Sequence, residues 1–163
     1  MSWEEKMTVD KLTQVAIVIG SKSDKSAVAE CKKIFNYFDI QYDELILSAH
    51  RNPKETARFA ENAEKNGYKV IIAIAGMAAH LPGVIAAHTI LPVIGVPMPN
   101  SSLNGLDSLY SMVQMPSGVP VATVAIGAAG AANAAVLAVQ ILGLENPELK
   151  EKLRLFKQNG CQI

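Results

Sequence analysis

The chain has 163 residues, of which 50% are hydrophobic and 18% charged, a balance typical of one ordered globular domain. Its 15 Lys and Arg residues match its 15 Asp and Glu residues, so no net field favours nucleic acid or an anionic membrane as a partner. Residues 1–14 carry no apolar signal core, and no run approaches the ~20 apolar residues that span a bilayer. We therefore expect a cytoplasmic protein.

From residue 15 onward, apolar runs alternate with amphipathic segments. Val15–Ile19 is a continuous, β-branched run, which is typical of a strand buried on both faces. Apolar residues at helical spacing between Ala27 and Phe38 predict a helix after it. The same alternation predicts strands over 41–47, 68–75, 92–96 and 120–126, and helices over 53–66, ending at Gly67, and over 84–89, 106–113, 128–142 and 146–158.

This alternation predicts an α/β fold, a single three-layer domain around a five-stranded parallel sheet. The common order for such a chain is the flavodoxin-like 2-1-3-4-5, with the ligand at the carboxyl ends of the strands where the order reverses. The turns over 20–24, 48–53 and 76–83 then line one crevice. We divide the chain into an N-terminal tail (1–14), the α/β domain (15–143) and a C-terminal helical extension (144–163).

The first turn, Gly20–Asp24, leads into a helix N-terminus, where free N–H groups favour an anion. Its serines are candidates for binding phosphate, and Asp24 is a candidate for binding ribose hydroxyls. The alternative is that Ser23 or Asp24 only caps the helix, since both residue types are preferred caps. The turn is neither a Walker A loop nor a GxGxxG fingerprint.

The second turn, Ser48–Pro53, places a hydroxyl, an imidazole and a guanidinium together. Asn52 and Pro53 have the residue types of a helix cap and a first helical position. His50 is a candidate acid and base, because an imidazole gives and takes a proton near neutral pH, and Arg51 is a candidate phosphate ligand. The alternative, a surface turn with an ion pair, is disfavoured by the position of this turn at the carboxyl edge of the sheet.

The third turn, Gly76–Gly83, is bounded by glycines that let a backbone approach a ligand closely, and it adds His80 as a polar group. The alternative is a purely conformational role. We expect His88 to be structural, because nothing pairs with it at helical spacing. Met115–Gly118, at the end of a long polar connection, is a candidate lid over the ligand.

The remaining features concern assembly and metals. The helix over 128–142 is apolar nearly all round, so we expect it to be buried in an oligomer and the tail helix to dock on a neighbouring subunit. Cys31 and Cys161 lie too far apart in the sequence to suggest a metal site or a disulfide framework. The three histidines lack HxxxH or HxH spacing, so we expect no metal.

Taken together, these motifs closely resemble the PurE family, the class I (bacterial-type) N5-carboxyaminoimidazole ribonucleotide mutases of purine biosynthesis. They run in the family's order from about residue 15 to 142, nearly the whole domain. The matching segments are Gly20-Ser21-Lys22-Ser23-Asp24, Ser48-Ala49-His50-Arg51, Ala78-Ala79-His80-Leu81-Pro82-Gly83, Leu91-Pro92-Val93-Ile94-Gly95-Val96-Pro97, Gln114-Met115-Pro116-Ser117-Gly118 and Gly130-Ala131-Ala132-Asn133-Ala134-Ala135.

The resemblance implies an isomerase that moves a carboxylate from the exocyclic amine of an aminoimidazole ribonucleotide to a ring carbon, without metal or cofactor. It implies that His50 shuttles the proton and that Ser21 and Asp24 bind the ribonucleotide. It also implies a homo-octamer. The other positions that it implies in substrate binding are Ser23, Ser48 and Arg51 at the phosphate, and Ala49, Gly76, Ala78, Ala79, His80 and Leu81 around the base and carboxylate.

Three positions depart from the family pattern, namely Met77 in place of a common glycine, and His88 and Ala128 in place of a frequent lysine. One alternative is the animal-type (class II) carboxylase, which uses CO2 directly and has a different third turn. A flavodoxin-like nucleotide-binding module is another, although aromatic residues are only 6% and Trp3 lies in the tail. A phospho-receiver lacks its acceptor, because no aspartate follows the third strand. A purely structural oligomer leaves His50 and Arg51 unexplained.

Overall fold

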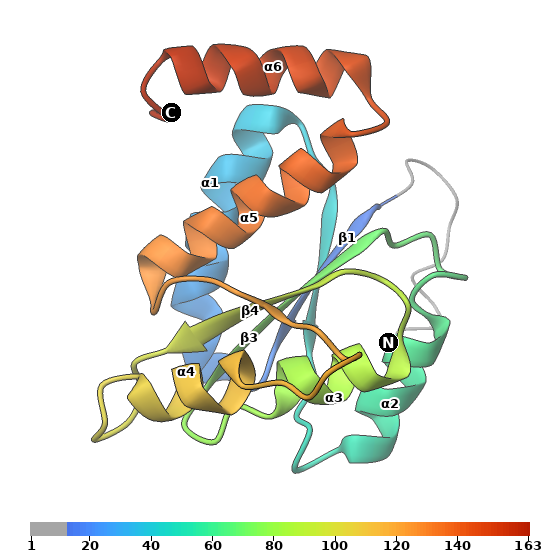
Figure 1. Ribbon diagram of the computed structural model, residues 1–163, viewed down its shortest axis with the longest axis vertical. Coiled ribbons are helices and arrows are strands. Elements are labelled where there is room, and N and C mark those ends of the chain that lie inside the picture. The colour runs from blue at the N-terminus through green and yellow to red at the C-terminus, as the bar shows by residue number, and fades with distance from the viewer. Residues whose placement is uncertain (1–12) are drawn as a thin grey trace.

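The computed structural model describes residues 13–163, so Trp3 and most of the expected N-terminal tail (1–14) lie outside the described residues. In the described part, one parallel sheet has the order β2-β1-β3-β4-β5, as predicted (Figure 1). Its strands are β1 (Val15–Ile19), β2 (Tyr42–Ile46), β3 (Val70–Gly76), β4 (Val93–Met98) and β5 (Ala122–Thr123).

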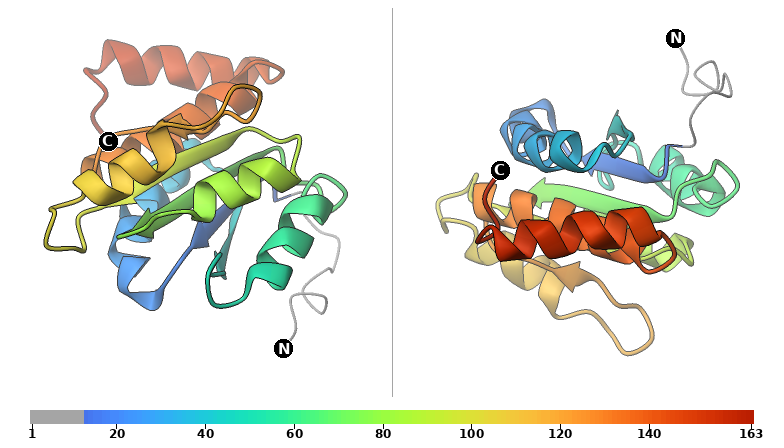
Figure 2. Two further views of the ribbon diagram at one scale, coloured as in Figure 1. Left: turned by 60° about the horizontal axis from the view of Figure 1, so that its bottom comes forward. Right: turned by 90° about the horizontal axis from the view of Figure 1, so that it is seen from above.

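Helices cover both faces of the sheet and complete the three predicted layers (Figures 1 and 2). One face is covered by α1 (Lys25–Phe38) and α5 (Ala128–Gly143), the other by α2 (Pro53–Asn62), α3 (Leu81–His88) and α4 (Leu106–Val113). Val15 and Ile17 in β1 pack toward α1 and α5, whereas Ala16 packs toward α2 and α3. Every residue of β1 is buried, because successive side chains point into opposite layers.

The last helix, α6 (Pro147–Gln158), lies across the outer side of α5 (Figure 2). Its Phe156 is buried, with its ring centroid 5.3 Å from that of Phe38 in α1. Lys152 forms an ion pair of 2.6 Å with Asp39, just after α1. This face of α6 therefore packs on its own chain, and docking of the helix on a neighbouring subunit stays a prediction. No helix within residues 13–163 combines the length and apolarity needed to cross a bilayer.

Three elements differ from the sequence expectation by three residues or more at one end, and the other boundaries agree within two residues. The helix α2 ends at Asn62 instead of residue 66, because a turn over 63–67 follows it, and this turn ends at Gly67 with a positive φ of 90°. The helix α3 begins at Leu81 instead of residue 84, since Pro82 is tolerated in a first turn that needs no N–H there. The strand β5 is limited to Ala122–Thr123 instead of 120–126; Pro120 has no N–H to donate to the ladder.

Candidate active site

The three predicted turns meet at the carboxyl edge of the sheet. Ile19 at the end of β1 is in register with Ile46 of β2 and Ile74 of β3, so all three chains leave the sheet side by side. The guanidinium of Arg51 donates a hydrogen bond of 3.4 Å to the carbonyl of Gly20, which joins the second turn to the first. The ring of His50 contacts the ring of His80, which joins the second turn to the third. The predicted convergence is confirmed.

Local hydrogen bonds shape the second turn. The hydroxyl of Ser48 accepts from the backbone N–H of Arg51 at 3.2 Å and from its Nε at 3.4 Å. Asn52 and Pro53 occupy the cap and first positions of α2, as predicted. The Asn52 side chain does not cap the helix; its Oδ1 accepts from the N–H of Ser48 at 2.7 Å and its amide donates to Glu55 at 2.6 Å. The exposed guanidinium of Arg51 is thus held in place by its own turn.

The two turn histidines form a direct pair. Nε2 of His50 lies 2.7 Å from Nδ1 of His80, and the two rings meet edge-to-face at 80° with centroids 4.9 Å apart. Both side chains are exposed at the edge of the sheet, where a ligand can reach them. A ring pair of this geometry can exchange or share a proton, because each nitrogen is a donor or an acceptor according to its tautomer.

In the first turn, Asp24 is buried with only 3% exposure, and its carboxylate accepts a hydrogen bond of 2.6 Å from the side-chain amide of Asn100. Burial raises the pKa of Asp24, while hydrogen bonds from the Ser21 backbone, the Ser23 hydroxyl and Asn100, and the charge of Arg51, oppose that rise. Asp24 makes no side-chain capping bond to α1. Asp24 thus holds the N-cap position of α1 without capping the helix through its side chain, so capping alone does not explain this residue.

The cap in this turn is Ser21. Its side chain accepts a hydrogen bond of 3.3 Å from the N–H of Ser23, at the start of the short 3-10 helix η2 (Lys22–Asp24). Ser23 itself is exposed at the same edge of the sheet. Capping therefore explains part of the role of Ser21, while the exposed Ser23 donates its hydroxyl to Asp24 at the surface that a ligand would approach.

The sequence reasoning did not single out Asn100. This residue follows β4, whose last residue, Met98, is in register with Gly76 of β3. The chain after β4 therefore arrives at the same edge as the three turns, and that topology was the signal that could have identified it. A Cβ on Gly76 would lie 3.3 Å from the Cβ of Asn100, so the third turn and Asn100 are in close contact.

The third turn presents its residues unequally. Ala79 and Leu81 are only 1% and 3% exposed and belong to the core beneath α2 and α3, where Ala49 also packs. A binding role for Ala79 or Leu81 must therefore use the backbone. Ala78 is exposed, and Met77, at a family glycine position, has a positive φ of 56° that favours glycine.

The candidate lid lies beside this turn. A Cβ on Gly83, in the first turns of α3, would lie 3.1 Å from the sulfur of Met115, so Met115 packs on the helix that begins next to His80. This contact places one end of the 115–118 segment near the site. Its closure over a ligand stays a prediction.

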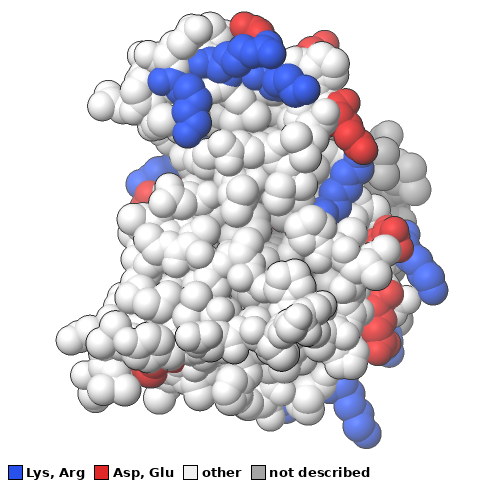
Figure 3. All heavy atoms as spheres, in the orientation of Figure 1, with Lys and Arg blue, Asp and Glu red and all other residues white. Residues whose placement is uncertain are grey.

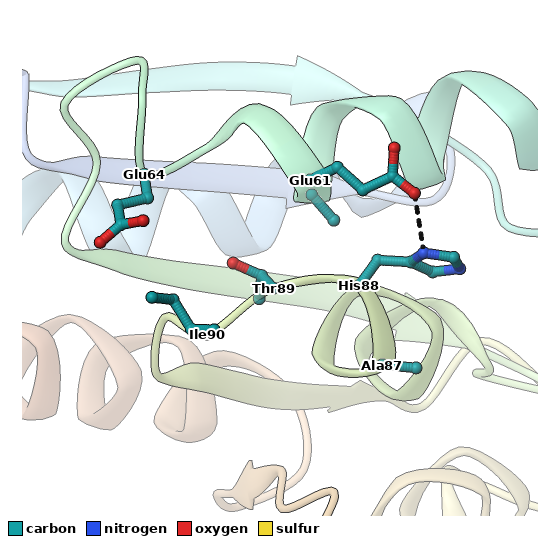
Figure 4. Close-up of a pocket in the computed structure, with 7 residues that line it drawn as sticks. Glu61, Glu64, Ala87, His88, Thr89 and Ile90 are labelled. Carbon is teal, nitrogen blue, oxygen red and sulfur yellow. Dashed lines mark hydrogen bonds and ion pairs between the residues drawn. The ribbon is translucent and has the colours of Figure 1, made fainter.

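A separate hollow lies between the ends of α2 and α3 (Figure 4). Nδ1 of His88 is 3.2 Å from Glu61 of α2, so His88 has a partner on another helix although none at helical spacing. His88 is the last residue of α3, whereas His80 lies at its start, so this hollow is distinct from the three turns. Over residues 13–163, no group of three or more His, Cys, Asp or Glu side chains is arranged to hold a metal ion.

Comparison with known proteins agrees with this arrangement. The model of a family described as "AIR carboxylase" matches residues 14–162. The chain is 54% identical over 155 residues to an N5-carboxyaminoimidazole ribonucleotide mutase of Haemophilus influenzae, covering 95% of this chain and 94% of the relative. It is 56% identical over 145 residues to the Escherichia coli protein of that name, covering 89% and 86%.

A solved structure, that of PurE from Treponema denticola, has a TM-score of 0.80 at 28% identity, covering 91% of this chain and 92% of that one. The two chains therefore share the whole α/β fold as well as sequence similarity. The family match spans all three turns of the site and nearly all the described residues. The chain therefore belongs to the AIR carboxylase, or PurE, family.

Proposed function

We propose that this protein is an N5-carboxyaminoimidazole ribonucleotide mutase, an isomerase of de novo purine biosynthesis. Relatives that carry this name are 54% and 56% identical over most of the chain. The observation that carries the proposal is the His50–His80 contact of 2.7 Å at the sheet edge where Asp24 and Arg51 also converge. An acid and base, a cation and a buried carboxylate together match a phosphorylated riboside whose ring must gain and lose a proton.

In this proposal the first two turns bind the ribonucleotide. The guanidinium of Arg51, oriented by Ser48 and by the Gly20 carbonyl, pairs with the phosphate. Ser23, whose hydroxyl donates to Asp24 in the substrate-free site, turns this O–H to the same phosphate when the ribonucleotide binds. The carboxylate of Asp24, which already accepts from the amide of Asn100, accepts from ribose hydroxyls. Ser21 supports the turn as its cap.

His50 then carries the proton through three steps. The imidazolium donates a proton to the ring carbon while the carbamate C–N bond breaks; its electron pair forms a C=N bond and CO2 leaves. The neutral imidazole takes one of the two protons of that carbon as the carbon attacks CO2. Transfer of the remaining proton from this carbon to the imine nitrogen restores the aromatic ring, and His50 is again an imidazolium. No proton or electron pair is lost in the cycle.

Recapture of CO2 requires that it stay in the site. Holding CO2 against the ring carbon makes the second step effectively unimolecular. The contact of Met115 with Gly83 at the start of α3 supports a role of the Met115–Gly118 segment in closing that space. Deleting it is expected to release CO2 and to yield the unmodified aminoimidazole ribonucleotide, and full activity of the deletion variant would contradict the lid role.

We also propose that the protein is a homo-octamer in the cytoplasm. Leu106, Tyr110 and Val113 form an exposed apolar stripe on α4, being 49%, 64% and 48% exposed. Figure 3 shows few charged side chains over α4 and α5 on the face it draws, while charge gathers on α6. Light scattering is expected to give eight times the chain mass, and the double variant Leu106→Lys, Tyr110→Lys is expected to give a smaller particle. An unchanged mass for this variant would remove α4 from the interface.

The function is tested with chelator-treated protein and two substrates. Absorbance follows conversion of the N-carboxylated ribonucleotide to its C-carboxylated isomer, and a parallel sample receives unmodified aminoimidazole ribonucleotide with bicarbonate. We expect fast conversion of the N-carboxylated substrate alone. Efficient use of the unmodified ribonucleotide would assign the class II carboxylase reaction, and inactivity with both would refute the proposed function.

The proton shuttle is tested with His50→Asn. Loss of a general acid and base is expected to lower kcat by roughly 10²–10⁴-fold, with the folded structure unchanged by circular dichroism. His88→Asn is the matched control, because this third histidine lies at the far end of α3 and pairs with Glu61. Near wild-type turnover in His50→Asn would exclude His50 as the shuttle.

A further inference from the structure

The contact between His50 and His80 links two rigidly supported turns. His80 occupies the cap position of α3, where its N–H donates to the Ala78 carbonyl at 2.8 Å and its own carbonyl accepts from Val84 at 2.9 Å. Its neighbours in the sequence, Ala79 and Leu81, are buried in the core. The backbone of His80 is therefore fixed from both sides, so the base of its side chain has a defined position opposite His50.

The turn of His50 is held by hydrogen bonds of its neighbours Ser48, Arg51 and Asn52, but these do not reach the ring of His50. Among the described residues, the ring of His50 makes its hydrogen-bonding contact with His80, and no other side chain is recorded as a partner of either nitrogen. The ring is exposed, so packing does not fix it. Its orientation and its tautomer thus depend on Nδ1 of His80 at 2.7 Å.

The contact limits the protonation states that the two rings can have at the same time. A hydrogen bond between two ring nitrogens needs one N–H and one lone pair, so the two rings cannot both be imidazolium while they remain in contact. When both rings are neutral, the nitrogen of His80 that bears the proton decides which nitrogen of His50 bears one. The pair therefore accommodates at most one positive charge, which is the charge that a single proton shuttle needs.

We propose that His80 is a positioning residue for the shuttle: its Nδ1 sets the orientation and the tautomer of His50 in the substrate-free site. This inference rests on the proposed function of His50 and deepens it. It differs from a role of His80 as a wall of the substrate pocket, because a wall residue would act mainly on KM. A positioning residue acts on kcat, since a misplaced shuttle binds substrate normally but transfers the proton slowly.

The kinetic test uses two substitutions that differ in where they place an amide. His80→Asn places an amide group near the position of Nδ1, whereas His80→Gln places it near that of Nε2. We expect His80→Asn to keep kcat within about tenfold of wild type, and His80→Gln and His80→Ala to lose roughly 10²-fold in kcat with little change in KM. A loss confined to KM, or equal losses in the Asn and Gln variants, would overturn the proposal.

The spectroscopic test needs no turnover. The chain has three histidines, so nitrogen-15 labelling of histidine gives three pairs of ring signals, and His88→Asn identifies one of them. We expect a scalar coupling across the hydrogen bond between Nε2 of His50 and Nδ1 of His80, and one dominant tautomer of His50. In His80→Ala the coupling is lost and His50 becomes a tautomer mixture. An unchanged tautomer of His50 in His80→Ala would refute the proposal.

The two tests separate this inference from the proposed function. If the wild-type protein lacks mutase activity but the coupling is present, the function fails while the ring pair stands. If the wild-type protein is an active mutase and His80→Ala alters neither kcat nor the signals of His50, the inference fails while the function stands.

Discussion

The side-chain amide of Asn100 donates a hydrogen bond of 2.6 Å to the carboxylate of Asp24, and this bond joins the segment after β4 to the turn after β1. The two residues are 76 positions apart in the sequence. Because Asp24 is only 3% exposed, its charge depends on donors from the protein instead of water. The stability of this edge of the sheet therefore depends on whether Asp24, a candidate for binding the substrate, is ionised.

Removing the donor tests this coupling. Asn100→Ala leaves the buried carboxylate of Asp24 with one partner fewer, and we expect a loss of about 1.5–3 kcal/mol in the free energy of unfolding near pH 7. Asn100→Asp places a second carboxylate beside the first and is expected to destabilise further. Urea unfolding measures both. Equal stability of Asn100→Ala and wild type would show that solvent replaces the amide.

The raised pKa of Asp24 predicts that this residue lowers the stability of the fold near neutral pH while it serves substrate binding. Burial raises this pKa in the folded state, so the contribution of Asp24 to stability is fully present below its ordinary pKa of 3.8 and is lost as pH rises through the folded value. Asp24→Asn is therefore expected to have a higher Tm than wild type at pH 7, with the difference shrinking toward pH 3.8. The same variant is expected to bind substrate poorly. Scanning calorimetry across pH measures the first effect, and Glu64→Gln, at an exposed acidic residue of the separate hollow between α2 and α3, is the control.

Arg51 is expected to be sensitive even to a conservative change. Lysine keeps the charge but loses the Nε–H bonded to Ser48 and the fork that reaches the Gly20 carbonyl. We expect Arg51→Lys to raise KM about tenfold or more, equivalent to about 1.4 kcal/mol, with a smaller effect on kcat. Arg154→Lys on α6 is the matched control. A KM unchanged by Arg51→Lys would place the phosphate elsewhere.

Gly130 permits the first turn of α5 to lie close to the segment between β5 and α5. A Cβ at this position would lie 1.6 Å from the carbonyl oxygen of Ala125, so the backbone must move to admit one. We expect Gly130→Ala to destabilise the fold by on the order of 4 kcal/mol or more, or to prevent folding. Ala129→Ser, at the adjacent exposed position, is expected to change stability by less than about 1 kcal/mol. Thermal unfolding of both variants compares them, and similar Tm values would contradict the packing described.

Tyr68 supports the opposite edge of the sheet. Its hydroxyl donates to Asp43 at 2.7 Å, and burial together with this carboxylate raises the pKa of Tyr68. Because the pair is only partly buried, we expect Tyr68→Phe to cost about 1 kcal/mol of stability. The residue precedes β3, away from the carboxyl ends of the strands, so kcat is expected to be unchanged. Tyr37→Phe, at a 40% exposed position of α1, is the control, and a stability loss there as large as that of Tyr68→Phe would count against the hydrogen bond.

Much of the fold was predictable because its signals are local. The unbroken apolar run Val15–Ile19 indicated a strand buried on both faces, and the structure has all five residues at 0% exposure. The βαβ alternation predicted a parallel sheet, and its strands have the order that is common for five-stranded α/β domains, which brings the three turns to one edge. The boundaries of α2, α3 and β5 were predicted less well. Whether a helix or strand continues through a turn or a proline at its end depends on the contacts of the neighbouring segments.

The sequence by itself determined the alternation of strands and helices and which turns hold candidate functional residues, since hydrophobic periodicity and residue type are properties of short segments. Only the tertiary structure decided which side chains meet. The 2.7 Å contact of His50 with His80, the bond from Asn100 to Asp24 and the contact of Arg51 with the Gly20 carbonyl each join separate turns or strands. Such contacts depend on sheet register and on the direction of each side chain, which are set when the whole core packs and not by any one segment.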